Sequence, residues 1–269
     1  AASAAPAVAA APPPPVFDIR KIMPRVAAPP TPSPPAEGLV DRMHFIVNNL
    51  AASNLEQKVM DMRSVLLEEH VPWLADYLVL KRIAHQLNFH GLYLDFVDRL
   101  QRPSLLPEIT RVAYYRVSVH LSSETITSST SERSILKHLG AWLGMTTLAR
   151  NRPILSRDLD VKELLLQGYE SGKLIAIAPF VAKVLEGAVR SVAFRPPNPW
   201  TMAVLATLRD LHVLDNLKMN IKFEVELLCN KLDIKVDQVP LRHSLSRRRS
   251  PVLPNQDFNL PRGGGGGGG

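Results

Sequence analysis

The segment GYESGKL, Gly168 to Leu174, is the part of this sequence that comes nearest to a phosphate-binding loop. Such a loop places four residues between its two glycines and follows the lysine with a serine or threonine that holds magnesium. Here three residues separate Gly168 from Gly172, and Leu174 stands at the magnesium-binding position. No strand pattern precedes the segment, so we interpret Gly172 as the residue that ends a helix.

The other residues that could do chemistry are scattered along the chain. The eight histidines include no HExxH or Cys-His grouping. His85 and His90 are five residues apart, so they would not lie on the same face of a helix. Glu68 and Glu69 are adjacent on a helix, so their carboxylates point in different directions. No G-x-S-x-G elbow and no cysteine nucleophile motif stands out. We therefore expect a protein that is not an enzyme and that uses no cofactor and no metal.

Composition divides the chain into three parts. Residues 1–37 are mostly alanine and proline, which favours polyproline II over helix. Residues 241–269 contain SLSRRRSP and close on seven glycines, a composition that cannot offset its ordering entropy by burial. We expect both ends to be disordered and residues 38–240 to form one folded domain.

The positive charge of the chain is concentrated in its tail. The net charge is +7, and the part after Pro240 holds five arginines against Asp257. An RNA-binding tail, a nuclear-import signal and a solvated tail with no partner all fit this pattern. RRRS, Arg247 to Ser250, is also similar to a protein-kinase target.

Cellular location follows from what the sequence lacks. The single cysteine, Cys229, excludes an intramolecular disulfide and favours a reducing compartment. No run of eighteen apolar residues is present, and the alanine-rich start has neither the basic nor the leucine-rich region of a secretory signal. We expect a cytoplasmic protein, with the nucleus as the alternative and no membrane contact.

Helical spacing of apolar residues dominates from Asp41 onward, and about ten helices with short connectors are expected. Ser53 and Glu56 match a capping box, which predicts a helix that runs to about Glu69. Ser131 is expected to cap a later helix. Asp160 and Glu163 offer a cap and third-position acid for the helix that Gly172 ends.

The proline-rich stretch FRPPNPWTM, Phe194 to Met202, is expected to end one helical segment and to begin the next helix. Asn198 can act as the N-cap, and Pro199 fits the first helical position, where its missing N-H costs nothing. Trp200 is then expected to pack back across the connector. The last helix, about Met219 to Leu232, is expected to bury four apolar residues: Phe223, Val225, Leu227 and Leu228.

Antiparallel helix pairs stacked side by side bury such apolar faces most simply. The fold predicted from the spacing is therefore an all-α solenoid of the HEAT or armadillo type. A closed bundle of ten helices is the less favoured alternative.

Polar and aromatic residues that the core does not need are the candidates for binding. In KRIAHQLNFH, Arg82 leaves the apolar face, and the LNFH turn is expected to present Asn88, Phe89 and His90, with a core position for Phe89 as the alternative. In ARNRP, residues 149–153, two arginines could bind an acidic partner or only complement a helix dipole.

Six segments, in chain order, resemble the central domain of the Not-one scaffold subunit family of the Ccr-Not deadenylase complex. They are FIVNNLAASNLEQK, PWLADYLVLKRIAHQLNFHGLYLDF, SERSILKHLGAWLGMTTLARNRPI, FVAKVLE, FRPPNPWTMAVL and NLKMNIKFEVELLCNKL. The resemblance covers nearly all of residues 38–240. It implies a fold like the middle domain of eukaryotic initiation factor four-gamma, with five HEAT-like helix pairs.

The resemblance also implies a function. In that family this domain is a platform, not an enzyme: it holds the Caf-one deadenylase, which shortens messenger-RNA poly(A) tails, and it docks a DEAD-box RNA helicase of translational repression and decay. Other Ccr-Not subunits would join through the rest of a longer chain, and the location would include mRNA-decay granules. RNA contact would be indirect or through the tail.

Site residues are transferred from the family by matching positions. The helicase-facing surface would include Arg82, Asn88 and Phe89, with Trp142 and Met145 as weaker candidates. Some relatives carry a larger polar residue before that tryptophan, where this chain has Ala141, which would remove a contact. The deadenylase-binding residues match no motif and stay unknown.

Overall fold

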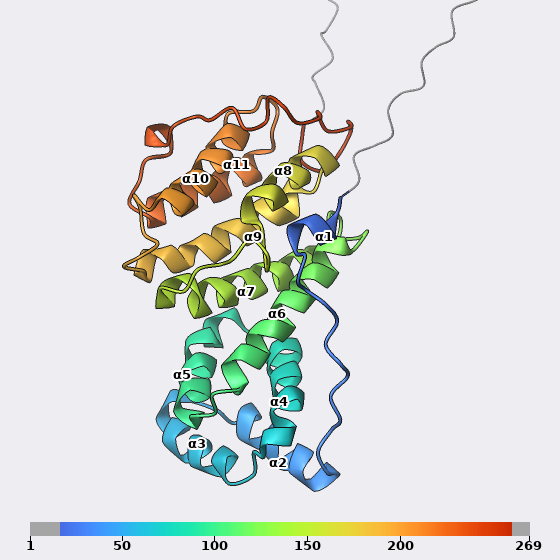
Figure 1. Ribbon diagram of the computed structural model, residues 1–269, viewed down its shortest axis with the longest axis vertical. Helices are drawn as coiled ribbons and strands as arrows, with labels where there is room; N and C mark the ends of the chain where they lie inside the picture. Colours follow the sequence, from blue (N-terminus) through green and yellow to red (C-terminus); the bar gives the residue numbers. More distant parts are fainter. Residues whose placement is uncertain (1–16, 260–269) are drawn as a thin grey trace, which may run out of the picture.

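The computed structural model describes residues 17–259, and all of the regular structure in that range is helical (Figure 1). The predicted all-α class is confirmed. Eleven α-helices are present in the described residues: α1 Ile19–Ile22, α2 Glu37–Asn48, α3 Leu55–Arg63, α4 Val71–Leu78, α5 His90–Leu100, α6 Leu105–Ser122, α7 Thr130–Thr146, α8 Val161–Ser171, α9 Leu174–Leu185, α10 Pro199–His212 and α11 Met219–Lys231.

The helices stack on one another along the length of the molecule, with contacts both between successive helices and between next-but-one helices, which agrees with the predicted solenoid. α3 packs on α5 and α4 on α6, and α6 leads to α7, which lies against α9. In the last part of the stack, α8 packs on α10, and α11 packs on both α9 and α10. Figure 1 shows α2 to α5 at one end, α8 to α11 at the other, and α6 and α7 between them.

Three glycines let α7 approach α9 and the turn after it, Glu186–Arg190, very closely. A Cβ atom on Gly144 would lie 2.3 Å from the carbonyl oxygen of Val184, and one on Gly187 would lie 2.2 Å from the carbonyl oxygen of Gly144. A Cβ on Gly140 would lie 2.8 Å from the carbonyl oxygen of Phe180. Backbone therefore packs against backbone here, as small residues permit.

Several predicted helix ends are confirmed. Asp160 accepts a hydrogen bond from the Glu163 N-H at 3.0 Å, and Asn198 accepts from the N-H groups of the residues after Pro199. Gly172 ends α8 with a φ of +69°, a conformation that favours glycine. Trp200 packs edge-on against Phe194, across the connector as expected.

Other predictions of local structure were wrong. α3 begins at Leu55 and ends at Arg63, and its N-cap residue is Asn54, not Ser53. The local side-chain bond is the one that the Ala51 N-H donates to the Oδ1 of Asn54. Ser129, not Ser131, caps α7. On α11, Phe223 and Leu227 are exposed, because no helix of the described chain covers that face.

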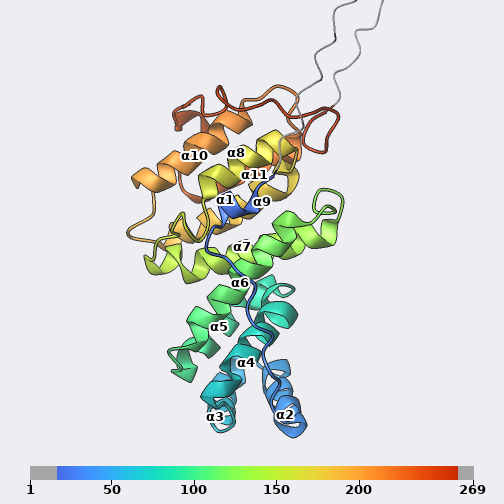
Figure 2. The same cartoon turned by 45° about the vertical axis from the view of Figure 1, so that its right-hand side comes forward.

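The described parts of both ends pack against the helices, which the composition did not predict. Ile22 is fully buried, and its carbonyl oxygen accepts from the Asp160 N-H at 2.8 Å. From α1 the chain runs as an extended strap, residues 24–36, back to α2 at the other end of the molecule (Figure 2). The predicted disorder of residues 1–16 and 260–269 lies outside the described residues.

Two buried or partly buried carboxylates attach the C-terminal segment, residues 241–259. Asp257 accepts from the N-H groups of Leu174 and Ile175, both at 2.8 Å, and so caps α9 from 83 and 82 residues away. Asp210 on α10 accepts from three consecutive N-H groups of the tail: Arg242, His243 and Ser244. The order of this segment comes from these long-range bonds, not from its own composition.

Candidate functional site

A surface hollow of about 340 Å³ lies where the start of α5 meets α7 and the turn 186–190. Met145 and Ala141 line it from α7, and Leu87, His90 and Gly91 line it from the α5 side. Lys183, Glu186 and Arg190 form the opposite rim. Met145 thus shares one depression with the residues that flank Asn88 and Phe89.

Asn88 and Phe89 are exposed beside this hollow. They belong to a short 3₁₀ turn, Leu87–Phe89, that leads directly into α5. The Phe89 side chain is 50 % exposed and leans on Tyr93, with 6.4 Å between the ring centroids. The core alternative for Phe89 is therefore wrong, and its ring is available to a partner.

His90 is buried, so the expectation that the turn presents its side chain was wrong. Its Nε2 lies 2.8 Å from the carbonyl oxygen of Ile83, and its ring meets Trp142 edge-on at 5.5 Å. Burial lowers the pKa of His90 to about 4, partly offset by the hydrogen bond to Ile83 and reinforced by His138. The neutral ring therefore holds the turn against α7.

Trp142 is 0 % exposed, so its direct contact with a partner is incompatible with this structure. The prediction failed because Trp142 lies on the face of α7 that packs into the core. A large aromatic side chain at helical spacing is usually part of such a buried face. Met145, in contrast, is partly exposed at the hollow.

Arg82 lies in a single π-helical turn, Val79–Ile83, that follows α4. Its Nη2 donates to the Tyr77 hydroxyl at 2.9 Å and to Asn48 of α2. Tyr77 in turn stacks on Trp73, with an interplanar angle of 5°. The guanidinium is thus held in place on a rigid aromatic support and is partly exposed.

Arg82 is linked electrostatically to the Phe89 side of the molecule through Tyr93. Burial raises the pKa of the Tyr93 hydroxyl, and the positive charge of Arg82 lowers it. The structure brings Met145 into the same hollow as Leu87 and His90, the residues that flank Asn88 and Phe89, whereas Arg82 does not line the hollow.

The basic tail is partly neutralised by the helices. The guanidinium of Arg248 pairs with Glu163 at 3.0 Å and with Glu170 at 3.2 Å, both on α8. These contacts reduce the charge that the tail can offer to RNA, which weakens the nucleic-acid alternative.

The family model described as "CCR4-NOT transcription complex subunit 1 CAF1-binding domain" matches residues 31–253. The chain belongs to this family. It is 38% identical over 219 residues to the General negative regulator of transcription subunit 1 of Schizosaccharomyces pombe, a match that covers 80% of this chain and 10% of that protein. It is 40% identical over 215 residues to CCR4-NOT transcription complex subunit let-711 of Caenorhabditis elegans, covering 77% and 8%.

The subunit 1 protein of Saccharomyces cerevisiae is 32% identical over 196 residues, covering 73% of this chain and 9% of that protein. The chain thus spans about a tenth of the length of the curated relatives it matches. The match to the CAF1-binding domain extends to residue 253, beyond the predicted boundary at residue 240 and into the segment that Asp210 holds.

In this member of the CAF1-binding domain family, sequence reasoning missed the far rim of the hollow. Lys183, Glu186 and Arg190 come from about 100 residues further along the chain than Leu87. The glycine spacing of α7 was the signal that could have located them, because Gly140 and Gly144 mark a close helix contact. No helix of the described residues is both long and apolar enough to cross a bilayer.

Proposed function

We propose that this chain is a non-catalytic scaffold module that binds a CAF1-type deadenylase and docks a DEAD-box RNA helicase. Poly(A)-tail shortening, translational repression and mRNA decay would then be coupled by tethering, because a bound nuclease has a high local concentration at the transcript. The observation that carries the deadenylase part is the match of residues 31–253 to the CAF1-binding domain.

The helicase part rests on the surface beside the hollow. An exposed aromatic ring, Phe89, stands next to the exposed amide of Asn88 and to a depression into which a partner side chain fits. Aromatic and arginine residues dominate binding energy at interfaces, and Arg82 supplies the second type on a rigid support.

Three exposed phenylalanines provide a matched test. The exposed fraction of the side chain is 62 % for Phe45 on α2, 50 % for Phe89 and 54 % for Phe223 on α11. Truncation of each therefore leaves the core intact. We expect Phe89→Ala to weaken helicase binding at least about tenfold, the effect of an interface hot spot. Phe45→Ala and Phe223→Ala should leave helicase binding unchanged.

The measurement is calorimetric titration of each variant with a purified DEAD-box helicase and, separately, with a CAF1-type nuclease. Nuclease binding should survive Phe89→Ala and Arg82→Ala. Loss of helicase binding in all three phenylalanine variants, or in none, would contradict the assignment of this surface. Equal loss of both partners in one variant would indicate misfolding, which a thermal melt of the same sample detects.

A further inference from the structure

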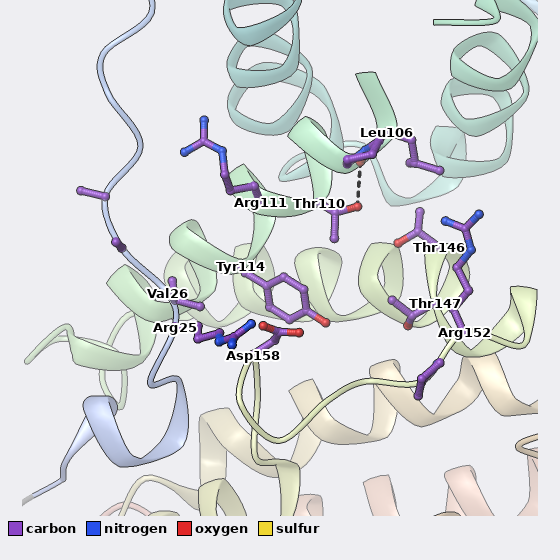
Figure 3. A pocket seen from close by; sticks show the side chains of 14 residues that line it. Arg25, Val26, Leu106, Thr110, Arg111, Tyr114, Thr146, Thr147, Arg152 and Asp158 are labelled. Atoms are coloured by element: carbon purple, nitrogen blue, oxygen red, sulfur yellow. Dashed lines mark hydrogen bonds between the residues drawn. The ribbon is translucent and has the colours of Figure 1, made fainter. Parts of the chain in front are cut away.

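A second and larger pocket, of about 510 Å³, lies between the N-terminal strap, α6 and the end of α7 (Figure 3). Val26, Ala27 and Ala28 of the strap form one wall, and Leu106 and Pro107 of α6 form another. Its volume is that of a small-molecule site, and its mixed apolar and polar lining is typical of such sites. It is separate from the hollow at Met145, with which it shares no residue.

Three arginines surround this pocket: Arg25, Arg111 and Arg152. Arg111 is already paired with Glu108 on its own helix, with 2.9 Å from Nε to Oε2. Within residues 17–259 the guanidinium groups of Arg25 and Arg152 make no ion pair and no side-chain hydrogen bond. Both residues are exposed, so each guanidinium group is open to an anionic ligand such as a phosphate.

Tyr114 and Asp158 occupy the middle of the pocket. Figure 3 shows the Tyr114 ring projecting into it, with its hydroxyl toward the Asp158 carboxylate. Neither side chain has a hydrogen-bond partner among the described residues. Burial, and next the charge of Asp158, raise the pKa of Tyr114, so its hydroxyl stays a donor. Asp158 can only accept, which calls for N-H or O-H groups on the ligand.

From this arrangement we infer that the pocket binds a ribonucleotide. Figure 3 shows Arg152 on the side of the pocket near Thr146 and Arg25 on the opposite side, beside Asp158. The phosphate would be bound by Arg152, away from the Asp158 carboxylate, and the base or ribose would donate hydrogen bonds to Asp158. The Tyr114 ring and the apolar wall of the strap would contact the planar base. A phosphate ion alone would leave the carboxylate and the apolar walls without a partner. The proposal does not depend on the scaffold function, because no residue of the helicase surface takes part.

The test is calorimetric titration of the whole 269-residue chain with AMP, GMP, adenosine and inorganic phosphate. We expect AMP or GMP to bind with one site per chain, and adenosine and phosphate to bind at least about tenfold more weakly. The variant Arg25→Ala/Arg152→Ala should weaken nucleotide binding at least about tenfold, the loss expected for one charge-assisted contact to the phosphate. Asp158→Asn should reduce the preference for nucleotide over phosphate.

Arg157→Ala is the matched control, since Arg157 is an exposed arginine close in sequence that does not line the pocket. It should bind nucleotide as the unmodified chain does. Bound nucleotide should also slow amide hydrogen exchange in residues 25–28, because these residues form a wall of the pocket. A short oligoadenylate distinguishes the source: displacement of AMP by the strand indicates an RNA nucleotide, and its failure to compete indicates a free one.

The inference is overturned if neither AMP nor GMP gives saturable binding up to about 5 mM, which corresponds to very weak affinity. It is also overturned if inorganic phosphate binds as tightly as AMP, or if the double arginine variant binds like the unmodified chain while melting at the same temperature.

Discussion

Replacing Gly144 by alanine should destabilise the domain, because α7 and α9 touch through their backbones at this residue. The added Cβ would meet the carbonyl oxygen of Val184 at 2.3 Å and that of Lys183 at 3.1 Å. Ordinary contacts of this kind begin near 3.4 Å, so the two helices must separate by about 1 Å. Carbonyl groups fixed in a helix cannot move aside as a flexible side chain can.

The expected cost can be worked from two opposing contributions. Overpacking of this kind costs about 1–3 kcal/mol, and the better helix propensity of alanine returns up to about 1 kcal/mol. The net loss of about 1–2 kcal/mol corresponds to a fall in melting temperature of roughly 2–8 °C for a domain of this size. Thermal unfolding followed by circular dichroism, with urea unfolding as a second measure, gives both quantities.

Gly91→Ala in α5 is the matched control. A Cβ on Gly91 would meet no atom within 4 Å, so only the helix propensity changes. We expect this variant to be at least as stable as the unmodified chain, with a gain below the roughly 1 kcal/mol of a helix interior because Gly91 lies in the first turn of α5. A Gly144→Ala variant that melts at or above the unmodified chain would refute the backbone contact. Adding Gly187→Ala to Gly144→Ala should cost less than the sum of the two, since one separation relieves both contacts.

Two further predictions concern buried side chains. Burial raises the pKa of Asp257 to about 6 despite the N-H groups of Ile175 and Leu174, so the folded state binds the proton more tightly than the unfolded state does. The contribution of Asp257 to stability should therefore rise by about 1 kcal/mol as the pH falls from about 7 to about 5, while His90, whose pKa burial lowers to about 4, acts in the opposite direction. In melts at the two pH values, the unmodified chain should gain this amount relative to Asp257→Asn, which keeps His90. Trp142→Phe should lower the stability by about 1–2 kcal/mol through lost packing. The affinity for the helicase, measured well below the melting temperature of the variant, should stay unchanged. A weaker affinity would show that Trp142 does contribute to helicase binding.

The sequence predicted three of the helix ends that depend on neighbouring residues, although the caps expected at Ser53 and Ser131 were wrong. The caps Asp160, Asn198 and Gly172 follow from side-chain chemistry within three residues, and all three are present. The exposure of Phe223 was missed because the periodicity of an apolar face is the same whether or not a helix covers it. The cap of α9 by Asp257 was missed because its partners are 82 and 83 residues away.

The candidate surface was predicted in part for the same reason. Asn88 and Phe89 interrupt a helical pattern, and a turn of this kind places its polar and aromatic residues outside the core. Trp142 and His90 stand on continuous helical faces, where only the packing of α5 against α7 decides burial. The far rim, Lys183 to Arg190, depends on how closely the glycines let α7 and α9 approach, a tertiary property.

The strap has a mechanical consequence for the molecule. In an open helical stack each repeat contacts only its neighbours, so the two ends of the stack are not held to one another. Here residues 24–36 run against the direction of the stack and join α1, docked on α8, to α2 at the opposite end (Figure 1). A segment of this length reaches at most about 45 Å when fully extended, and its prolines keep it stiff. The two ends of the stack are thus joined by a second connection besides the contacts between neighbouring helices, so they can separate only if the strap straightens or α1 leaves α8.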